Sequence, residues 1–173
     1  MFLCGTYRMA VDMIDFDLLL QWFVQLLIAF VSTLAFSFIF HTPHKQRIFI
    51  GITGGLGWIT YVAASFFGIE TAVASFIAAL VITWISRLCA FHRKEPITTF
   101  LICGIFPIVP GAGIYYTGYY LFMGENALGA GKGFETLKIA IAIALGIGIV
   151  SSLPRFLFIG GRKKQERKKE AEK

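Results

Sequence analysis

The chain has 173 residues, of which 57% are hydrophobic and 15% are charged. This composition excludes an ordinary soluble domain, in which roughly a quarter of the residues are charged, and indicates a single-domain integral membrane protein. The net charge of +6 does not imply nucleic-acid binding, because most of the excess lies in residues 160–173. We interpret these residues as a solvated cytoplasmic tail that sets orientation, with specific contact to anionic lipid or RNA as the alternative.

Residues 1–17 form an N-terminal segment that we expect to be retained. They include Asp12, Asp15 and Asp17, and they lack the short apolar core and small-residue cleavage site of a signal peptide.

Five apolar segments follow, and each is long enough to cross a hydrocarbon layer of roughly 30 Å as a helix rising about 1.5 Å per residue. The predicted fold is therefore all-α, with five transmembrane helices in one domain over residues 18–159. The spans are expected at residues 18–40, 48–67, 71–91, 97–123 and 134–158.

The first span carries two glutamines on one face. Gln21 and Gln25 lie four residues apart, so they either hydrogen-bond to a neighbouring helix or lie in the headgroup layer beside Trp22. The loop after this span contains His41 and His44, which we do not expect to bind a metal because nothing else nearby coordinates one.

The second and third spans should form a closely packed hairpin joined by a tight turn at residues 68–70. Gly51 and Gly55 form a G-x-x-x-G pair, and the third span repeats small residues at the same spacing. Trp58 and Tyr61 either contact lipid or face a cavity.

Arg87 lies near the end of the third span. We expect it to snorkel toward the membrane interface, with contact to an anionic ligand or a partner's acid as the alternative.

The last part of the chain combines a glycine-rich stretch with an apolar span. Residues 124–133 are expected to form a loop without the glycine–lysine pattern of a phosphate-binding site. In the span that follows, one stripe of small residues contains Ala140, Ala144 and Gly148, and a second contains Ala142 and Gly146. Packing on more than one side is therefore expected.

The distribution of Lys and Arg predicts the topology. The loops at residues 41–47 and 87–96 and the C-terminal tail are basic, whereas the turn at residues 68–71 has no basic residue. Five spans with the N-terminus outside and the C-terminus in the cytoplasm place all three basic segments on one side.

The fourth span is interrupted at its centre. Pro107 and Pro110 each remove a backbone donor, and Gly111 and Gly113 permit close backbone approach. Irregular backbone is tolerated at membrane depth only where protein buries it or it lines a cavity, so we predict a polar site here. The candidate substrate-binding residues are Pro107, Pro110, Gly111, Gly113, Tyr115, Tyr116 and Tyr119.

The chemistry expected of this site is anion binding. Free amides around residues 111–114, at the positive N-terminus of a helix, attract carboxylates, and the tyrosines add hydroxyl donors. The alternative is a simple kink, with the tyrosines in an aromatic belt at the membrane interface.

Several kinds of chemistry have no support in the sequence. Cys4, Cys89 and Cys103 are odd in number and form no C-x-x-C pair, so neither a disulfide framework nor a zinc site is predicted. No hydrolase or metalloprotease motif occurs, and we expect neither an enzyme nor a cofactor. No acid or histidine falls in the middle of a predicted span, so a group that couples transport to protons is expected on another chain.

The chain resembles the small-subunit, or C-terminal half, type of the threonine/serine exporter family. The resemblance rests on F-H-T-P at residues 40–43, G-I-T-G-G-L-G-W at 51–58, S-F-I-A-A at 75–79 and I-F-P-I-V-P-G-A-G-I-Y at 105–115. It implies a component of a multispan exporter whose hallmark is the P-x-x-P-G segment at Pro107, Pro110 and Gly111.

We therefore expect the small subunit of a bacterial inner-membrane exporter for threonine and serine, or for dicarboxylates such as succinate. Its expected partners are a larger exporter subunit, the carboxylate-bearing solute and the lipid bilayer, but not nucleic acid, and self-association stays open. The alternative is a non-transporting scaffold or assembly subunit of a membrane complex.

Overall fold

The computed structural model describes the backbone of residues 2–153 and the side chains of residues 20–153. The end of the predicted last span and the basic tail at residues 160–173 lie outside the described residues. The described part consists of helices joined by short connections and contains no strand. Its elements are α1 (Phe2–Ile39), η1 (His44–Gln46), α2 (Arg47–Phe66), α3 (Thr71–Arg93), α4 (Ile97–Ile105), η2 (Phe106–Ile108), α5 (Gly111–Phe122) and α6 (Asn126–Ser152).

Four segments are long and apolar enough to cross a membrane: Leu20–Ile39, His44–Phe66, Thr71–Arg93 and Asn126–Ser152. A fifth span results if the pair Ile97–Ile108 and Gly111–Phe122, which is bent by 54°, is counted as one broken helix. The all-helical membrane fold and the break in the fourth span are thus confirmed.

The ends of the helices lie at residues that cannot continue one. Gly68 and Gly124 have φ of 75° and 80° after α2 and α5. His41 and Lys94 also have positive φ, and Pro43 and Pro96 follow them two residues later. Because a proline lacks the N–H that a helix interior requires, α1 and α3 end shortly before Pro43 and Pro96.

The prediction of a glycine-rich loop at residues 124–133 is wrong, because α6 already begins at Asn126. A Cβ at Gly129 would lie 2.9 Å from Leu121 of α5, and one at Gly133 would lie 3.1 Å from Thr117. These glycines let α5 and α6 pack closely. The packing offsets the cost of placing glycine in a helix, which is about 1 kcal/mol per residue relative to alanine.

Helix α2 lies between α1 and α3 and contacts both through glycines. A Cβ at Gly54 would lie 2.1 Å from Thr33 of α1, and one at Gly57 would lie 2.2 Å from Ile82 of α3. The predicted close packing of the second and third spans is therefore confirmed at Gly57, but the G-x-x-x-G pair Gly51 and Gly55 lies against α1 and not against α3.

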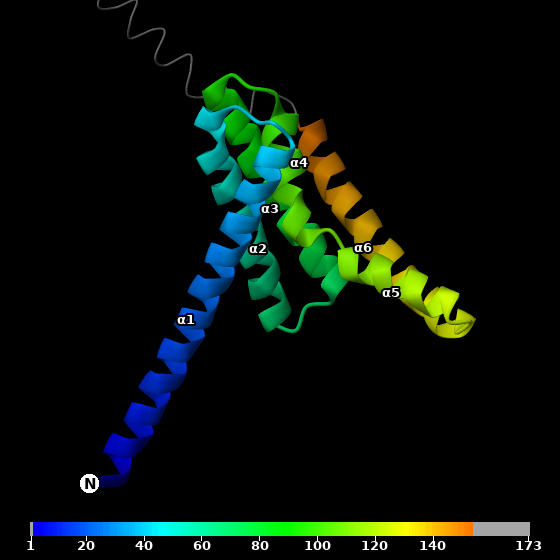
Figure 1. Cartoon of the computed structure of the whole chain (residues 1–173). Helices are drawn as coiled ribbons and strands as arrows, with labels where there is room; N and C mark the ends of the chain where they lie inside the picture. Colours follow the sequence, from blue (N-terminus) through cyan, green and yellow to red (C-terminus); the bar gives the residue numbers. More distant parts are fainter. Residues whose placement is uncertain (1, 154–173) are drawn as a thin grey trace, which may run out of the picture.

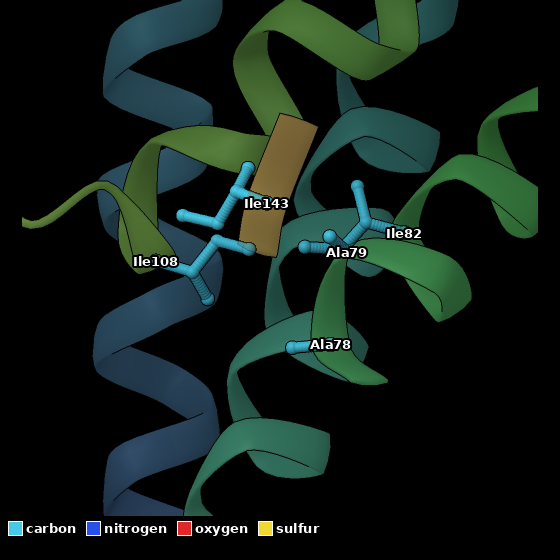
Figure 2. Packing of buried hydrophobic residues seen from close by; sticks show 5 residues of the cluster. All are labelled: Ala78, Ala79, Ile82, Ile108 and Ile143. Carbon is cyan, nitrogen blue, oxygen red and sulfur yellow. The ribbon is translucent and has the colours of Figure 1, made fainter. Parts of the chain in front are cut away.

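The main hydrophobic core joins the break to the long helices. Figure 2 shows Ile108 of η2 beside Ile143 of α6, with Ala79 and Ile82 of α3 nearby. Ile108 is 5% exposed and Ile82 is fully buried. The irregular turn of the fourth span is thus anchored by an apolar side chain in the centre of the bundle.

Figure 1 shows how the helices are arranged. Helices α1 to α4 run beside one another, although the first part of α1 extends beyond the bundle. Helix α5 and the first part of α6 lean away from the bundle, and the last part of α6 returns to pack on α3. The loop after α1, the connection between α3 and α4 and the end of α6 lie at one end of the molecule. The N-terminus of α1 and the turn between α2 and α3 lie at the other end. Both described basic loops are therefore at the same end, which is the arrangement that the predicted topology requires.

Arg87 of α3 binds the C-terminal end of α6. Its guanidinium donates hydrogen bonds to the carbonyl of Val150 and, at 2.8 Å, to that of Leu153. The last carbonyls of a helix have no intrahelical partner, so this contact caps α6. This role was not predicted from the sequence.

Two glycines of α6 allow a matched test of its packing on α3. A Cβ at Gly146 would lie 2.9 Å from that of Ala79, whereas one at Gly148 would meet nothing within 4 Å. We expect Gly146→Leu to destabilise the fold by about 1–3 kcal/mol because it forces α6 away from α3. The thermal midpoint of the protein purified in detergent should fall for Gly146→Leu and stay unchanged for Gly148→Leu. Equal midpoints for the two variants would contradict this packing.

Candidate functional site

The break in the fourth span is built by its two prolines. Val109, which precedes Pro110, is extended with φ of −63° and ψ of 130°, as expected because a following proline disfavours helical backbone. Helix α5 then begins at Gly111, and no side chain caps its N-terminus. The chain therefore ends one helix and starts another within a few residues.

The open amides at the break are fewer than the sequence suggested. The Gly111 amide donates to the Val109 carbonyl at 2.7 Å, and the Ile114 amide donates to Pro110 at 3.1 Å. The amides of Ala112 and Gly113 lie between them in the first turn and have no backbone acceptor within the described residues. Two of the four expected amides are thus available to a ligand.

A cavity of about 400 Å³, here called the break cavity, lies against this turn. It is formed by residues of α2, α3, η2, α5 and α6 and by the extended residues between η2 and α5. Its lining residues are Trp58, Tyr61, Thr71, Ser75, Pro107, Ile108, Val109, Pro110, Gly111, Ala112, Gly113, Tyr116, Lys132, Glu135, Thr136 and Ile139.

The structure brings five of the seven candidate residues together. Pro107, Pro110, Gly111, Gly113 and Tyr116 all line the break cavity. Their role in binding a substrate stays a prediction.

Tyr115 and Tyr119 do not line the break cavity. They are 66% and 44% exposed, and their rings stack on each other with centroids 6.4 Å apart on the surface of α5. No residue of α5 is buried. The tyrosine cluster is therefore mainly a surface of α5, from which only Tyr116 reaches the cavity.

Charged residues of α6 form part of the cavity wall, and they were not predicted from the sequence. The Lys132 ammonium lies 2.8 Å from a carboxylate oxygen of Glu135, and both side chains are exposed. A Cβ at Gly113 would lie 2.4 Å from Thr136 Oγ1, so Gly113 permits the close approach of α5 and α6 here. Lys132 and Glu135 are three residues apart, a spacing that pairs opposite charges on a helix, but the surrounding glycines led us to expect a loop.

The aromatic wall of the cavity comes from α2. Trp58 and Tyr61 face the cavity, and their ring centroids lie 5.3 Å apart. The Trp58 indole N–H donates to Gln25 Oε1 at 2.8 Å, which joins α2 to α1. Of the two expectations for Gln25, the hydrogen bond to a neighbouring helix is therefore confirmed.

The donor groups at the break do not suit a metal ion. Within the part of the chain that the structure describes, no three His, Cys, Asp or Glu side chains gather at one place. The cavity instead offers two amides at a positive helix end, one ammonium and one carboxylate. These groups suit a small polar solute that carries charge of both signs.

The family comparison agrees with this architecture. The family model described as Threonine/Serine exporter, ThrE matches residues 25–153, which include the C-terminal part of α1, all of the other described helices and the break. No solved structure matches the chain. The chain therefore belongs to the threonine/serine exporter family and is a multi-pass membrane transporter of that type.

Proposed function

We propose that this chain is the small subunit of an inner-membrane exporter and that its solute, threonine or serine, binds in the break cavity. The observation that carries the proposal is the position of this cavity. It lies where a transmembrane helix is interrupted, and its wall contains two open amides, a cation and an acid. Broken helices whose N-termini face a cavity bind anionic groups of solutes in membrane transporters.

The charges at the cavity favour an amino acid over a dicarboxylate. A solute carboxylate is attracted by the amides of Ala112 and Gly113 and by Lys132, whereas a solute ammonium is attracted by Glu135. Succinate, the competing candidate, would bring a second carboxylate toward Glu135. Because like charges repel, this arrangement selects for a zwitterion.

Hydroxyl groups on the wall suit the side chain of threonine or serine. Ser75 Oγ donates to the Thr71 carbonyl at 2.8 Å, and Thr136 Oγ1 donates to the Lys132 carbonyl at 2.8 Å. Both hydroxyl protons are therefore used, and the oxygens keep lone pairs that accept a hydrogen bond from a solute hydroxyl.

The proposed orientation has the N-terminus outside and the C-terminus in the cytoplasm. It is supported by the two basic segments, at residues 41–47 and 87–96, which lie around the end of α1 and the end of α3 at one end of the bundle (Figure 1). Lys138 and Glu70 form an ion pair of 2.9 Å near the opposite end. In this orientation the break cavity lies on the outer half of the membrane, because Thr71 at the outer turn is one of its lining residues.

Two glycines of α5 test the site with matched variants. A Cβ at either Gly111 or Gly118 would meet nothing within 4 Å, but only Gly111 lines the break cavity. We expect Gly111→Leu to fill the cavity and reduce threonine efflux at least about tenfold, equivalent to about 1.4 kcal/mol of lost solute binding. Gly118→Leu should export normally. Normal efflux from membrane-inserted Gly111→Leu protein would contradict the site.

Two further variants test the choice of solute. Lys132→Gln should raise the KM for threonine efflux because it removes a charge that attracts the carboxylate. Glu135→Gln should weaken threonine efflux and favour succinate because it removes a like charge. Lys138→Gln, which changes a lysine outside the cavity, is the control. Equal losses in Lys132→Gln and Lys138→Gln would show that charge at the cavity does not select the solute.

The proposal of a larger partner subunit is now supported by a different observation from the one used in the sequence analysis, which was the lack of an acid or histidine in the middle of a span. Glu135 lies inside α6 and at the cavity, so an acid within a helix is present after all. The support is now the exposed tyrosine face of α5, because phenol groups within a bilayer need polar partners.

Threonine efflux from cells that make this chain with and without the larger subunit tests the partner. We expect efflux only when both are present, since the exposed face of α5 is then covered. Full transport by this chain alone would contradict the need for a partner.

A further inference from the structure

Two more cavities lie along α1, and neither belongs to the break cavity. One, of about 220 Å³, is lined by residues 40–43 at the end of α1 and by Thr98, Thr99, Ile102 and Cys103 of α4. We call it the end cavity. The other, of about 440 Å³, is lined by Gln21, Val24, Gln25, Ile28, Ala29 and Ser32 of α1 together with Trp58 and Pro107. We call it the α1 cavity.

The end cavity and the α1 cavity follow one another in the same order on α1 and on the broken span, and the break cavity adjoins the α1 cavity at Pro107. On α1, Ser32 lines the α1 cavity, Phe36 lies one turn later, and Phe40, a further turn on, lines the end cavity. On the broken span, Cys103 lines the end cavity, Phe106 follows, and Pro107 lines both the α1 cavity and the break cavity. Both stretches of chain therefore place a phenylalanine between the end cavity and the α1 cavity, and Pro107 joins the α1 cavity to the break cavity.

An aromatic layer separates the end cavity from the α1 cavity. The Phe36 and Phe106 rings stack with centroids 3.9 Å apart, and the Phe40 ring lies 5.7 Å from that of Phe106. These contacts join α1 directly to η2.

A second partition separates the α1 cavity from the break cavity. Trp58 lines both of these cavities, and the hydrogen bond from its indole to Gln25 Oε1 holds it in place. Pro107 is the other residue shared by the two linings, and it directly follows Phe106 in η2. A movement of this one short turn would therefore act on both partitions.

We propose that the solute passes from the end cavity through the α1 cavity to the break cavity, and that the Phe36–Phe106 stack and Trp58 close this route at two points. This inference rests on the proposed function and adds its path and its closures. The lining of the α1 cavity contains no ionisable side chain, but Gln21, Gln25 and Ser32 supply polar groups. These groups can hydrogen-bond to the ammonium and the carboxylate of a zwitterion, whose opposite charges partly compensate each other, whereas a solute with a net charge would find no ionic partner here.

Thiol labelling measures these closures without requiring transport. Ser32 in the α1 cavity is changed to cysteine in the full chain after the native cysteines have been replaced by alanine. A charged maleimide that cannot cross the membrane is then added to sealed vesicles, either right-side-out or inside-out, and the rate at which it labels this cysteine is measured. With both partitions closed, labelling should be slow from both sides.

Opening each partition should expose this cysteine to one side only. Phe36→Ala should raise the labelling rate about tenfold from the side of the basic loops, and Gln25→Leu, which releases Trp58, should raise it about tenfold from the opposite side. Phe23→Ala is the control for the first variant, because Phe23 is 56% exposed and lines none of the three cavities. Gln21→Leu is the control for the second, because Gln21 lines the same cavity but does not bind Trp58.

The outcomes separate this inference from the proposed function. Labelling that stays slow from both sides in Phe36→Ala and Gln25→Leu would overturn the route, even if Gly111→Leu abolishes efflux. If Phe36→Ala fails to fold, Phe106→Leu tests the same layer. Faster labelling from the predicted side in each variant supports the two closures. If this labelling is observed but the chain exports neither amino acid even when the larger subunit is present, the route stands and only the exporter assignment fails.

Discussion

The interruption of a transmembrane helix by Pro107 and Pro110 is the constraint on which the rest of the structure depends. Each unpaired backbone group exposed to lipid costs several kcal/mol, so a break at this depth requires other protein around it. Ile108 meets this requirement from one side, since it is 5% exposed and packs with Ile82 and Ile143. On the other side, the first amides of α5 open onto a cavity.

The glycines of α2 and α6 make this arrangement possible. Gly57 brings α2 against Ile82, and Gly146 brings α6 against Ala79, so α3 lies in contact with both helices. The walls of the break cavity come from these same helices. Close packing and the position of the break cavity are therefore linked: the residues that let helices approach also determine where a space remains between them.

The membrane class, the approximate spans and the break follow from hydropathy and from the fixed dihedral angles of proline, which are local properties of the sequence. The start of α6 did not follow from them. Gly129 and Gly133 have low helix propensity, but contacts with Leu121 and Thr117 of α5 outweigh it, and such contacts are visible only in the fold. Because that stretch was expected to be a loop, the cavity-lining pair Lys132 and Glu135 was missed as well.

The central claim is that the first turn of α5 binds the carboxylate of an amino acid. Hydrogen–deuterium exchange of residues 109–117, measured in the purified protein with and without threonine, tests it most directly. We predict that threonine slows exchange at Ala112 and Gly113, that glycerol at the same concentration does not, and that Gly111→Leu abolishes the response. Exchange that is the same with and without threonine at these two amides would contradict the claim.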